Sequence, residues 1–444
     1  MYEQSFSQKN LRRIFDDENK KGRYLESEFL PEIEKLSKKV KSARQSLIRI
    51  RKKKTSYSKN VYEKRRNRIL AILRDRKNNR SEQINKELHS VATSISKKSF
   101  MLNITPGAKL SGRATFRLGN TVEEFFASKQ LQRNINIAFG TKQSCRHYVI
   151  PQLATILQDN LPKIVVRTDI SRFYENLNHN KLFDLIKSEG GLSLSSKKML
   201  RKLLSDYSRL SETPDKGVPR GVGVSAYLSE IYMTSLDEKL NALEDIIYYA
   251  RYVDDMVLVF CPPTPTRENK YLALVKSAIE SCSLEVNLKK TEEIDLTRTS
   301  KGKKFDFLGY NFHKDKEIHL DLSRRKLEAY QEKMDIVFEK YTTSNRSKAN
   351  ERILINRIRF LTGNTKLSNN KGGAFVGIYF SNKFINQSKG IDFLDTYLES
   401  KINVLQKATL RRRLRKLTFS EGFNARTFRK FTTKELSAIT RVWK

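Results

Sequence analysis

The sequence predicts an α+β fold in which an antiparallel sheet backed by helices lies between two basic helical ends. In residues 31–98, Leu, Ile and Val recur at spacings of three and four among charged residues, which is typical of long helices. From about residue 100 to residue 315, strand-like segments alternate with helical ones. From about Leu322 onward the helical spacing returns. A chain of 444 residues is long enough for several packed units.

The charge balance points to a polyanionic partner. Lys and Arg total 87 against 49 Asp and Glu, which gives a net charge of +38. Because so large an excess repels itself, we expect nucleic acid to neutralise part of it. A membrane surface is the rival polyanion, but no stretch approaches the roughly 18 apolar residues of a spanning helix. Residues 1–30 also lack the apolar core of a signal peptide, so we expect a cytoplasmic protein without a membrane partner.

The cysteines give no support for a disulfide framework or a zinc site. Cys145, Cys261 and Cys282 are odd in number, widely separated and not arranged as CxxC. We therefore expect three thiols with no structural or catalytic role.

The basic helices at the two ends are predicted to lie along phosphate backbone. Between Lys38 and Arg80 there are eighteen Lys or Arg and two acids, whereas a solvated helix face normally mixes both signs. A merely solubilising surface is the alternative. The residues expected to contact phosphates are Arg51, Lys52, Lys53, Arg65 and Arg66 near the N-terminus, and Arg411, Arg412 and Arg413 near the C-terminus.

The middle of the chain supplies the predicted sheet and its helices. Residues 121–132 are expected to form a helix, and the alternating residues 134–150 to form two short strands joined by a loop that holds Lys142. Residues 161–182 predict a buried strand that runs into a helix, and residues 193–208 a basic amphipathic helix. A glycine-broken turn then opens a helix after Gly217, and residues 303–320 predict a pair of strands.

Adjacent carboxylates interrupt the stretch "YYARYVDDMVLVF", residues 248–260. Neighbouring side chains of a straight strand face opposite sides, so Asp254 and Asp255 share a site only if they lie at a hairpin tip. Asp169 ends a second buried strand and is placed to join them. Hard oxygen ligands suit Mg²⁺, and three carboxylates that hold two ions suit phosphoryl transfer. The alternative for the acid pair alone is a solvated turn.

The ordered motifs resemble those of reverse transcriptases. "YVDD" at Tyr252 to Asp255 looks like the signature hairpin of that family, and Asp169 is followed by Phe173 and Tyr174. "GVPRGVGVS" begins at Gly217, and "LEVNLKKT" and "FDFLGY" follow. The resemblance covers roughly residues 100–315 and implies a right-hand polymerase. It implies an N-terminal extension (1–98), fingers (99–168), a palm (169–315, with a fingers insertion near 190–215) and a helical thumb with an RNA-binding region (316–444).

The resemblance also implies a role for each matching residue. Asp169, Asp254 and Asp255 would bind two Mg²⁺ ions, for which Mn²⁺ is a substitute, and Lys290 would neutralise the leaving pyrophosphate, with Lys289 as the alternative. The nucleotide site would include Tyr174, which excludes a 2′-hydroxyl, together with Lys142, Arg146, Arg220 and Gly221. The primer and template would contact Tyr252, Phe307, Gly309 and Tyr310. Core packing is the alternative for Tyr174 and Phe307, and plain surface is the alternative for Lys142 and Arg146.

Two positions depart from the family pattern. Arg220 stands where relatives often have Gln, and Ala226 where they often have Pro. These departures put the contact with the template in doubt more than the chemistry.

The absence of ribonuclease H-like acids and of a His-rich nuclease motif makes the chain similar to prokaryotic reverse transcriptases outside introns. These are retrons, abortive-infection enzymes and defence-associated enzymes, and residues Arg357 to Asn382 resemble the type 3 defence-associated group. The implied function is an RNA-directed DNA polymerase, a nucleotidyltransferase that copies an associated noncoding RNA in antiviral defence. Expected partners are that RNA, the DNA product, deoxynucleoside triphosphates, and a second reverse transcriptase subunit or a second copy of the chain. Protein-primed or untemplated synthesis and a catalytically silent RNA-binding scaffold remain alternatives.

Overall fold

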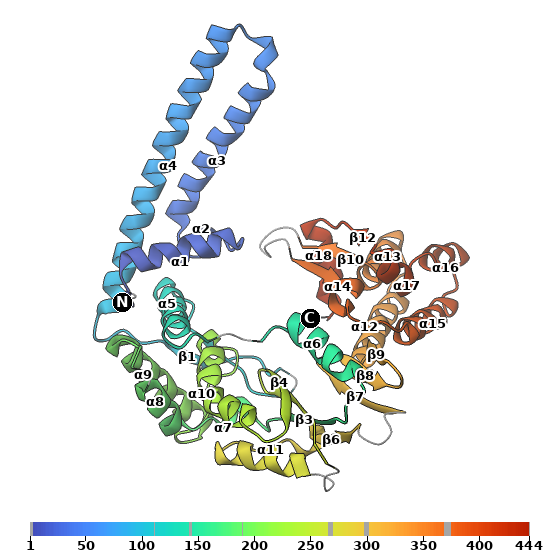
Figure 1. Ribbon diagram of the computed structural model, residues 1–444. Coiled ribbons are helices and arrows are strands. Elements are labelled where there is room, and N and C mark those ends of the chain that lie inside the picture. Colours follow the sequence, from blue (N-terminus) through green and yellow to red (C-terminus); the bar gives the residue numbers. More distant parts are fainter. Residues whose placement is uncertain are drawn as a thin grey trace. The chain divides into compact units, whose positions relative to one another are not determined.

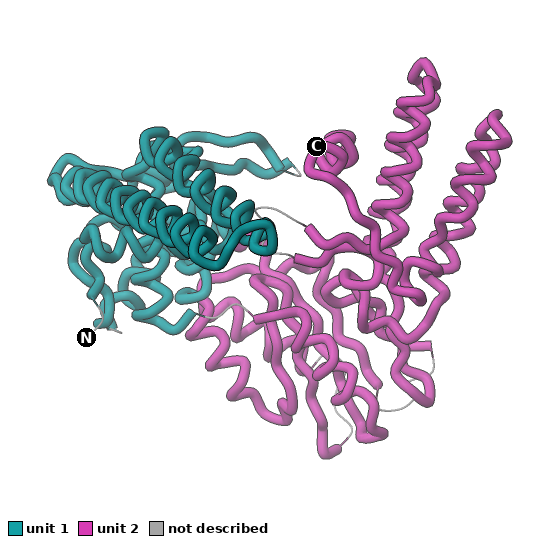
Figure 2. The backbone as a smooth tube through the Cα atoms, turned by 90° about the horizontal axis from the view of Figure 1, so that it is seen from above, with its two compact units in different colours: residues 1–142, 174–232 teal, residues 143–173, 233–444 magenta. Residues whose placement is uncertain are grey.

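The computed structural model describes residues 3–110, 112–141, 144–188, 190–264, 270–296, 302–367 and 374–443. Lys142 lies outside these residues. The chain divides into two compact units, coloured in Figure 2: unit 1 contains residues 1–142 and 174–232, and unit 2 contains residues 143–173 and 233–444. The predicted boundaries of fingers, palm and thumb stay predictions. No helix in the described part of the chain has both the length and the apolar composition needed to cross a bilayer.

Unit 1 is largely helical. Its elements are α1 (Gln8–Lys20), α2 (Leu25–Phe29), α3 (Pro31–Lys52), α4 (Lys59–Ser96), β1 (Ile104–Pro106), β2 (Phe116–Leu118), α5 (Val122–Phe139), α8 (His179–Ser188), α9 (Leu194–Ser211) and the first part of α10 (Gly223–Asn241). Strands β1 and β2 pair as a short antiparallel hairpin. The predicted amphipathic helix at residues 193–208 and the glycine turn that opens a helix are both confirmed.

Helices α3 and α4 form a long helical hairpin, as the residue spacing predicts (Figure 1). At 1.5 Å per residue, the 38 residues of α4 extend over about 57 Å. Val40, Ala43, Leu47 and Leu73 form the apolar seam between the two helices. The turn that joins them contains a short 3-10 helix, Lys54–Ser56. The charged residues therefore lie on the outside of the hairpin.

The prediction of two strands at residues 134–150 is wrong. Helix α5 continues to Phe139, and helix α6 (Arg146–Gln158) begins soon after it. A capping box of Thr121 and Glu124 begins α5, and Gly140 ends it in a left-handed conformation. The core face of α5 includes Gln130 and Asn134, so the apolar residues alone do not display the helical spacing.

Unit 2 is built around a four-stranded antiparallel sheet of strand order β4-β5-β3-β6. Its strands are β3 (Ile164–Asp169), β4 (Ile246–Tyr252), β5 (Asp255–Phe260) and β6 (Glu292–Asp295). The two central strands, β3 and β5, are almost entirely buried. Helix α11 (Lys270–Ser281) packs on β3 and β6, and α6 packs on β4. The predicted antiparallel sheet backed by helices is confirmed.

A second sheet in unit 2 has three strands where the sequence predicts two. It consists of β7 (Lys303–Phe307), β8 (Tyr310–Lys314) and β9 (Ile318–Leu322), in that order. Its apolar side chains share one core with α6 and with the four-stranded sheet. The shared core fixes the β7–β8 turn relative to β5.

The C-terminal part of unit 2 is helical, as predicted, with a small sheet that the sequence does not reveal. The helices are α12 (Arg324–Thr342), α13 (Lys348–Thr362), α14 (Ile378–Asn382), α15 (Lys389–Asn403), α16 (Ala408–Leu414), α17 (Phe419–Asn424) and α18 (Thr433–Thr440). Strands β10 (Asn364–Lys366), β11 (Phe375–Gly377) and β12 (Phe428–Arg429) form the sheet, with β10 in the centre.

Candidate active site

The β4–β5 hairpin carries the acid pair at its tip, as predicted. Tyr252 and Asp255 are the last paired residues of the two strands, so Val253 and Asp254 form the turn. Asp255 is also the register partner of Asp169 on β3. Two strands that are far apart in the sequence therefore place their carboxylates at the same end of the sheet.

The turn itself is strained. Val253 has a φ of 61°, a left-handed conformation that a β-branched side chain rarely adopts. Residues held there cost on the order of 1–3 kcal/mol and occur most often at functional sites. The strain supports a functional role for the turn, because an Asn-Gly or Gly-Gly turn would connect the same strands without it.

Two side chains contact the Asp169 carboxylate. Lys290 donates from Nζ to Oδ2 at 2.7 Å, and Asn287 donates from Nδ2 to Oδ1 at 2.9 Å. Both residues come from the loop between α11 and β6, where Leu288–Lys290 is a 3-10 helix. Lys289 is exposed, so the structure selects Lys290 rather than its neighbour as the ammonium beside the aspartates.

Burial and mutual repulsion act together on the acid pair. Burial raises the pKa of Asp254 and of Asp255, and the negative charge of Asp169 raises both further. The Lys290 charge lowers the pKa of both in part. With raised pKa values, the folded state keeps protons that the unfolded chain has already released. The two carboxyls therefore destabilise the cation-free fold increasingly as the pH rises through their folded pKa values.

The donor set suits a divalent cation. Three buried or half-buried carboxylates with one ammonium leave an excess of negative charge, and carboxylate oxygens are the preferred ligands of Mg²⁺. Among the described residues, no group of three or more His, Cys, Asp or Glu side chains is arranged as a metal site. Asn287 and Lys290 instead occupy the two oxygens of Asp169, so a cation would have to share or displace those contacts.

A cationic pocket of about 820 Å³ adjoins Asp255 within unit 2. It lies between the start of α6, strands β3 and β4, the β7–β8 turn and α12. Its lining includes four cations, Arg146, Arg167, Arg325 and Lys326, against two acids, Asp255 and Asp306. Burial, together with the charge of Arg146, lowers the pKa of Lys326 to about 7. The pocket can therefore accept anionic groups beside Asp255.

Sequence reasoning missed three of these cations. Arg167 precedes Asp169 by two residues on β3, so both side chains point to the same face of the sheet. The two-residue spacing could therefore have predicted from sequence that Arg167 lies on the same face of the sheet as Asp169. Among the described side chains, Arg167 Nε is buried without a hydrogen-bond partner. Arg325 and Lys326 begin α12, far along the sequence, and only the tertiary fold brings them to the pocket.

The remaining predicted residues of unit 2 differ in exposure. Tyr252 is 43% exposed and lines the pocket, whereas Phe307 and Tyr310 are fully buried in the core shared by the two sheets. Phe307 packs in the core and also lines the pocket, so its predicted contact with the primer stays a prediction. The turn between them, Leu308 and Gly309, faces the pocket with both residues at positive φ.

Arg146 begins α6 rather than a strand loop. Its guanidinium donates to the Ser381 carbonyl oxygen at 2.9 Å and lies 5.7 Å from the centre of the Tyr310 ring. It therefore has structural partners and still lines the pocket.

In unit 1, Tyr174 and Arg220 contact one another. The Arg220 guanidinium lies 4.9 Å from the centre of the Tyr174 ring and pairs with Glu175 at 3.2 Å. The Tyr174 carbonyl oxygen accepts a hydrogen bond from the Val218 backbone at 2.7 Å. The departure at Arg220 thus has a local reason, because Glu175 and Tyr174 supply partners for a guanidinium.

The glycines of this segment meet protein backbone. Gly221 has a φ of 94°, and a Cβ there would lie 2.7 Å from the Phe116 carbonyl oxygen. Gly217 has a φ of 85° and is similarly tight against Tyr207 and the Glu175 carbonyl oxygen. Packing alone therefore accounts for these two glycines.

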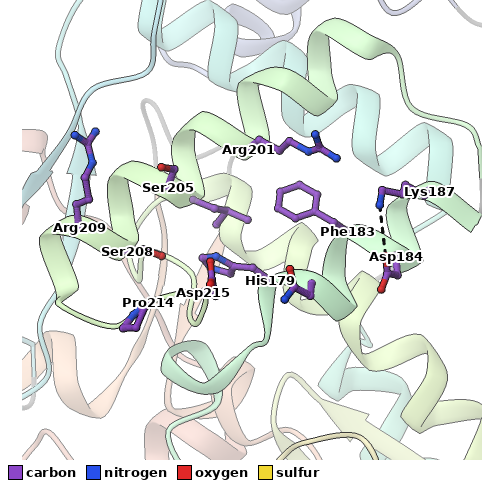
Figure 3. A pocket seen from close by; sticks show the side chains of 12 residues that line it. His179, Phe183, Asp184, Lys187, Arg201, Ser205, Ser208, Arg209, Pro214 and Asp215 are labelled. Carbon is purple, nitrogen blue, oxygen red and sulfur yellow. Dashed lines mark ion pairs between the residues drawn. The ribbon is translucent and has the colours of Figure 1, made fainter.

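A second pocket, of about 400 Å³, lies between α8 and α9 in unit 1. Figure 3 shows the Phe183 ring in this pocket near Arg201, whose guanidinium is 5.4 Å from the ring centre. Its charges are largely compensated, since Lys187 pairs with Asp184. The sequence assigns no role to these residues.

The predicted phosphate contacts are mostly free to meet a ligand. Arg51, Lys52, Lys53 and Arg65 are exposed around the tip of the α3–α4 hairpin, and Arg66 is half-buried. On α16, Arg412 and Arg413 are exposed, whereas Arg411 donates to the Leu405 carbonyl oxygen at 2.7 Å.

Comparison with known proteins gives one family match. Residues 120–312 match the family described as Reverse transcriptase (RNA-dependent DNA polymerase). No curated protein matches the chain.

Similar solved structures are telomerases of low identity. Apo telomerase from Candida tropicalis truncated from its C-terminal domain is 18% identical over 51% of this chain and 56% of that chain, with a TM-score of 0.36. Apo telomerase from Candida tropicalis is 15% identical over 78% and 62%, with a TM-score of 0.38. Telomerase from Candida albicans in complex with a TWJ fragment of telomeric RNA is 12% identical over 82% and 69%, with a TM-score of 0.32. The chain thus spans less than two thirds of the first two.

The family match includes the β3 and β5 aspartates, Lys290 and the β7–β8 turn. Residues 120–312 are therefore similar to a reverse transcriptase domain, and the antiparallel sheet backed by helices agrees with a right-hand polymerase fold.

Proposed function

We propose that the chain synthesises DNA on an RNA template at Asp169, Asp254 and Asp255. The observation that carries the proposal is the register pairing of Asp169 with Asp255 beside a strained turn that holds Asp254. These carboxylates would hold two Mg²⁺ ions, with Mn²⁺ as a substitute. Bound there, the ions would activate the 3′-hydroxyl and stabilise the leaving pyrophosphate.

The other residues of unit 2 hold charge and position substrate. Lys290 contacts the Asp169 carboxylate and supplies positive charge close to the developing negative charge. The cationic pocket holds phosphate groups of the primer or the nucleotide, and the Leu308–Gly309 turn offers its backbone to the primer end. Tyr252, half exposed in the same pocket, contacts the terminal nucleotide.

For unit 1 we propose the nucleotide contacts that the resemblance implies. Tyr174 excludes a 2′-hydroxyl, and Arg220 holds the Tyr174 ring in place by stacking on it. Gly221 is kept as a nucleotide contact through its backbone, although its packing against Phe116 already requires a glycine there. Lys142, outside the described residues, is kept as a triphosphate contact. Arg146, in unit 2, is likewise kept as a triphosphate contact, from its place in the cationic pocket.

We also propose the biological setting. A structured noncoding RNA, held by the exposed cations of the α3–α4 hairpin and of α16, serves as the template. Antiviral defence and assembly with a second reverse transcriptase subunit or a second copy rest on the resemblance of residues 357–382 to the type 3 defence-associated group. Sequencing the RNA that co-purifies with the protein tests the choice of template.

Asp254→Asn tests the catalytic proposal. The change keeps the side-chain volume and removes one carboxylate, so we expect DNA synthesis to fall by on the order of 10³-fold or more. Incorporation of labelled deoxynucleotides on an RNA template with Mg²⁺ measures it. Asp295→Asn is the matched control, because Asp295 pairs with Ile164 at the opposite end of β3. Full synthesis by Asp254→Asn would show that the chemistry occurs elsewhere.

A further inference from the structure

Three phenylalanines from separate segments form an aromatic cluster on the small C-terminal sheet of unit 2. The cluster consists of Phe375 on β11, Phe380 on α14 and Phe428 on β12. Figure 1 shows α14 beside β10 and β12, and β11 pairs with β10. The Phe375 and Phe380 rings stack with centroids 4.9 Å apart, and the Phe428 ring meets each of them at 5.7 Å. The sheet register brings β11 and β12 to opposite sides of β10.

Two of these rings remain open to solvent. Phe375 is 46% exposed and Phe428 is 50% exposed, so about half of each apolar side chain stays in contact with water, which is unfavourable. Exposed apolar groups that gather in one place mark interaction surfaces more often than single exposed residues do. The cluster is therefore better explained by a ligand than by the stability of the unit.

The surroundings of the cluster are cationic. No acid occurs between Arg357 and Ile391 or between Gly422 and Lys434, the two segments that supply the sheet; Glu421 and Glu435 border the second segment, and the charge of Glu421 acts on Arg429. Lys366, the register partner of Phe375, places its ammonium 5.5 Å from the centre of that ring. The basic residues exposed in these segments include Lys366, Lys383, Arg426 and Lys430.

Aromatic faces ringed by cations match unpaired nucleotides. A base stacks on a ring while its phosphate meets a neighbouring cation, and each stacked base contributes about 1–3 kcal/mol. A paired duplex hides its base faces, so it would use the cations and leave the rings without a partner. A protein partner fits less well, because the cores of protein interfaces are depleted of charged residues.

We propose that the aromatic cluster is a stacking site for unpaired bases of a single-stranded nucleic acid, separate from the polymerase site. The strand is a single-stranded part of the RNA template or of the DNA product, since both present the same base faces and phosphates. The site goes beyond the proposed polymerase function, because it lies on a different sheet from the aspartates and holds a strand without reacting with it.

Strand binding by the full chain tests the proposal. Fluorescence anisotropy with oligo(U) and oligo(dT) of about 12 nucleotides, in the presence of excess unlabelled RNA duplex, isolates single-strand binding. For the double variant Phe375→Leu and Phe428→Leu we expect at least a roughly ten-fold loss of affinity, because two stacking faces are removed while apolar bulk remains. For Phe375→Tyr and Phe428→Tyr we expect retained affinity.

Phe393→Leu is the matched control, since Phe393 is 45% exposed on α15 of the same unit but outside the cluster. If the Leu variant loses affinity for only one of the two oligonucleotides, that result identifies the bound strand as RNA or as DNA. Unchanged affinity of the Leu variant, or an equal loss for duplex measured alone, would overturn the proposal.

Two further measurements separate this site from the polymerase site. Oligo(U) that carries 5-iodouridine should cross-link to the peptides that contain Phe375 or Phe428, and a cross-link map without them would count against the site. The Leu variant should extend a short preformed primer–template at the normal rate, whereas Asp254→Asn should bind oligo(U) normally. The two proposals therefore fail independently.

Discussion

The strand hairpin β4–β5 and the helical hairpin α3–α4 both bring like charges together, but the charges of the first are half-buried and most charges of the second are exposed to water. In the strand hairpin, two adjacent acids are half-buried and a third acid lies across the sheet on β3. In the helical hairpin, most of the eighteen Lys and Arg residues between Lys38 and Arg80 are exposed to water, on the two long helices and the turn that joins them. Burial decides the consequence, because water and salt screen exposed charges over about 10 Å and screen buried ones far less.

The difference explains what each hairpin can bind. Burial raises the pKa of Asp254 and of Asp255, and the charge of Asp169 raises both further, so these carboxylates need a compact cation at one point. Exposed Lys and Arg side chains spread along helices tens of ångströms long suit an extended polyanion. Binding is favoured because it releases the counterions of that polyanion. The comparison predicts that the first hairpin responds to pH and metal, and the second to salt.

Lys290→Met removes the ammonium that contacts Asp169, and it has the largest expected effect of the three tests that follow. We expect DNA synthesis to fall by about 100-fold, since one preorganised charge beside the reacting groups is lost. The Lys290 charge lowers the pKa of Asp254 and Asp255, so its removal raises both and moves the acid limb of the activity profile to higher pH. The ratio of wild-type to variant activity should therefore grow as the pH falls, in steady-state rates measured across pH.

Lys289→Met is the control, because this exposed neighbour carries the same charge without the contact. If both variants lose activity equally and neither shifts the pH profile, the contact between Lys290 and Asp169 has no specific role in DNA synthesis.

Arg51→Gln with Lys52→Gln tests the helical hairpin. RNA affinity falls with salt concentration, and each lost phosphate contact makes the plot of log affinity against log salt concentration less steep by about 0.7–0.9. We expect the double variant to lower the slope for RNA binding by about 1.4–1.8. Its rate on a short preformed primer–template should stay unchanged. Titrations at several salt concentrations give the slope.

The matched control lies on the same helix. Lys35 and Lys38 each pair with a glutamate, at 2.6 and 3.0 Å, so Lys35→Gln with Lys38→Gln removes two charges that are already compensated. An equal change of slope in both double variants would mean that the hairpin acts only through its overall charge.

The strand hairpin could be predicted from sequence because its evidence is local. Two acids amid strand-forming residues leave a turn as their shared position, and Asp169 ends a strand on its own evidence. The choice between Lys289 and Lys290 could not be made, since it depends on how a 3-10 turn is oriented against β3. Arg325 and Lys326 were missed for the same reason.

The error at α5 has a different cause. Gln130 and Asn134 are fully buried on its core face, where the Gln130 side chain donates to Asn134 at 2.7 Å. Polar residues that satisfy one another inside a core remove the apolar signal that marks a helix. The remaining alternation of Ile135 and Ile137 then imitates a strand, although Ile137 is exposed. The roles of Tyr174 and Gly221 stay predictions.

Tyr57→Leu has the smallest expected effect and sharpens the comparison at the tip of the helical hairpin. The Arg65 guanidinium lies 4.6 Å from the centre of the Tyr57 ring, a cation–π contact worth about 0.5–1 kcal/mol at an exposed site. Loss of the ring frees Arg65 without removing its charge. We therefore expect RNA affinity to fall by about two- to five-fold at a fixed salt concentration, with the salt slope unchanged.

Tyr57→Phe keeps the ring and should bind like the wild type, so it separates the ring from the hydroxyl. A reduced slope in Tyr57→Leu would mean that Arg65 meets phosphate only when the ring holds it. In that case the helical hairpin would share the property that distinguishes the strand hairpin, a charge that works because its position is fixed rather than because it is one of many.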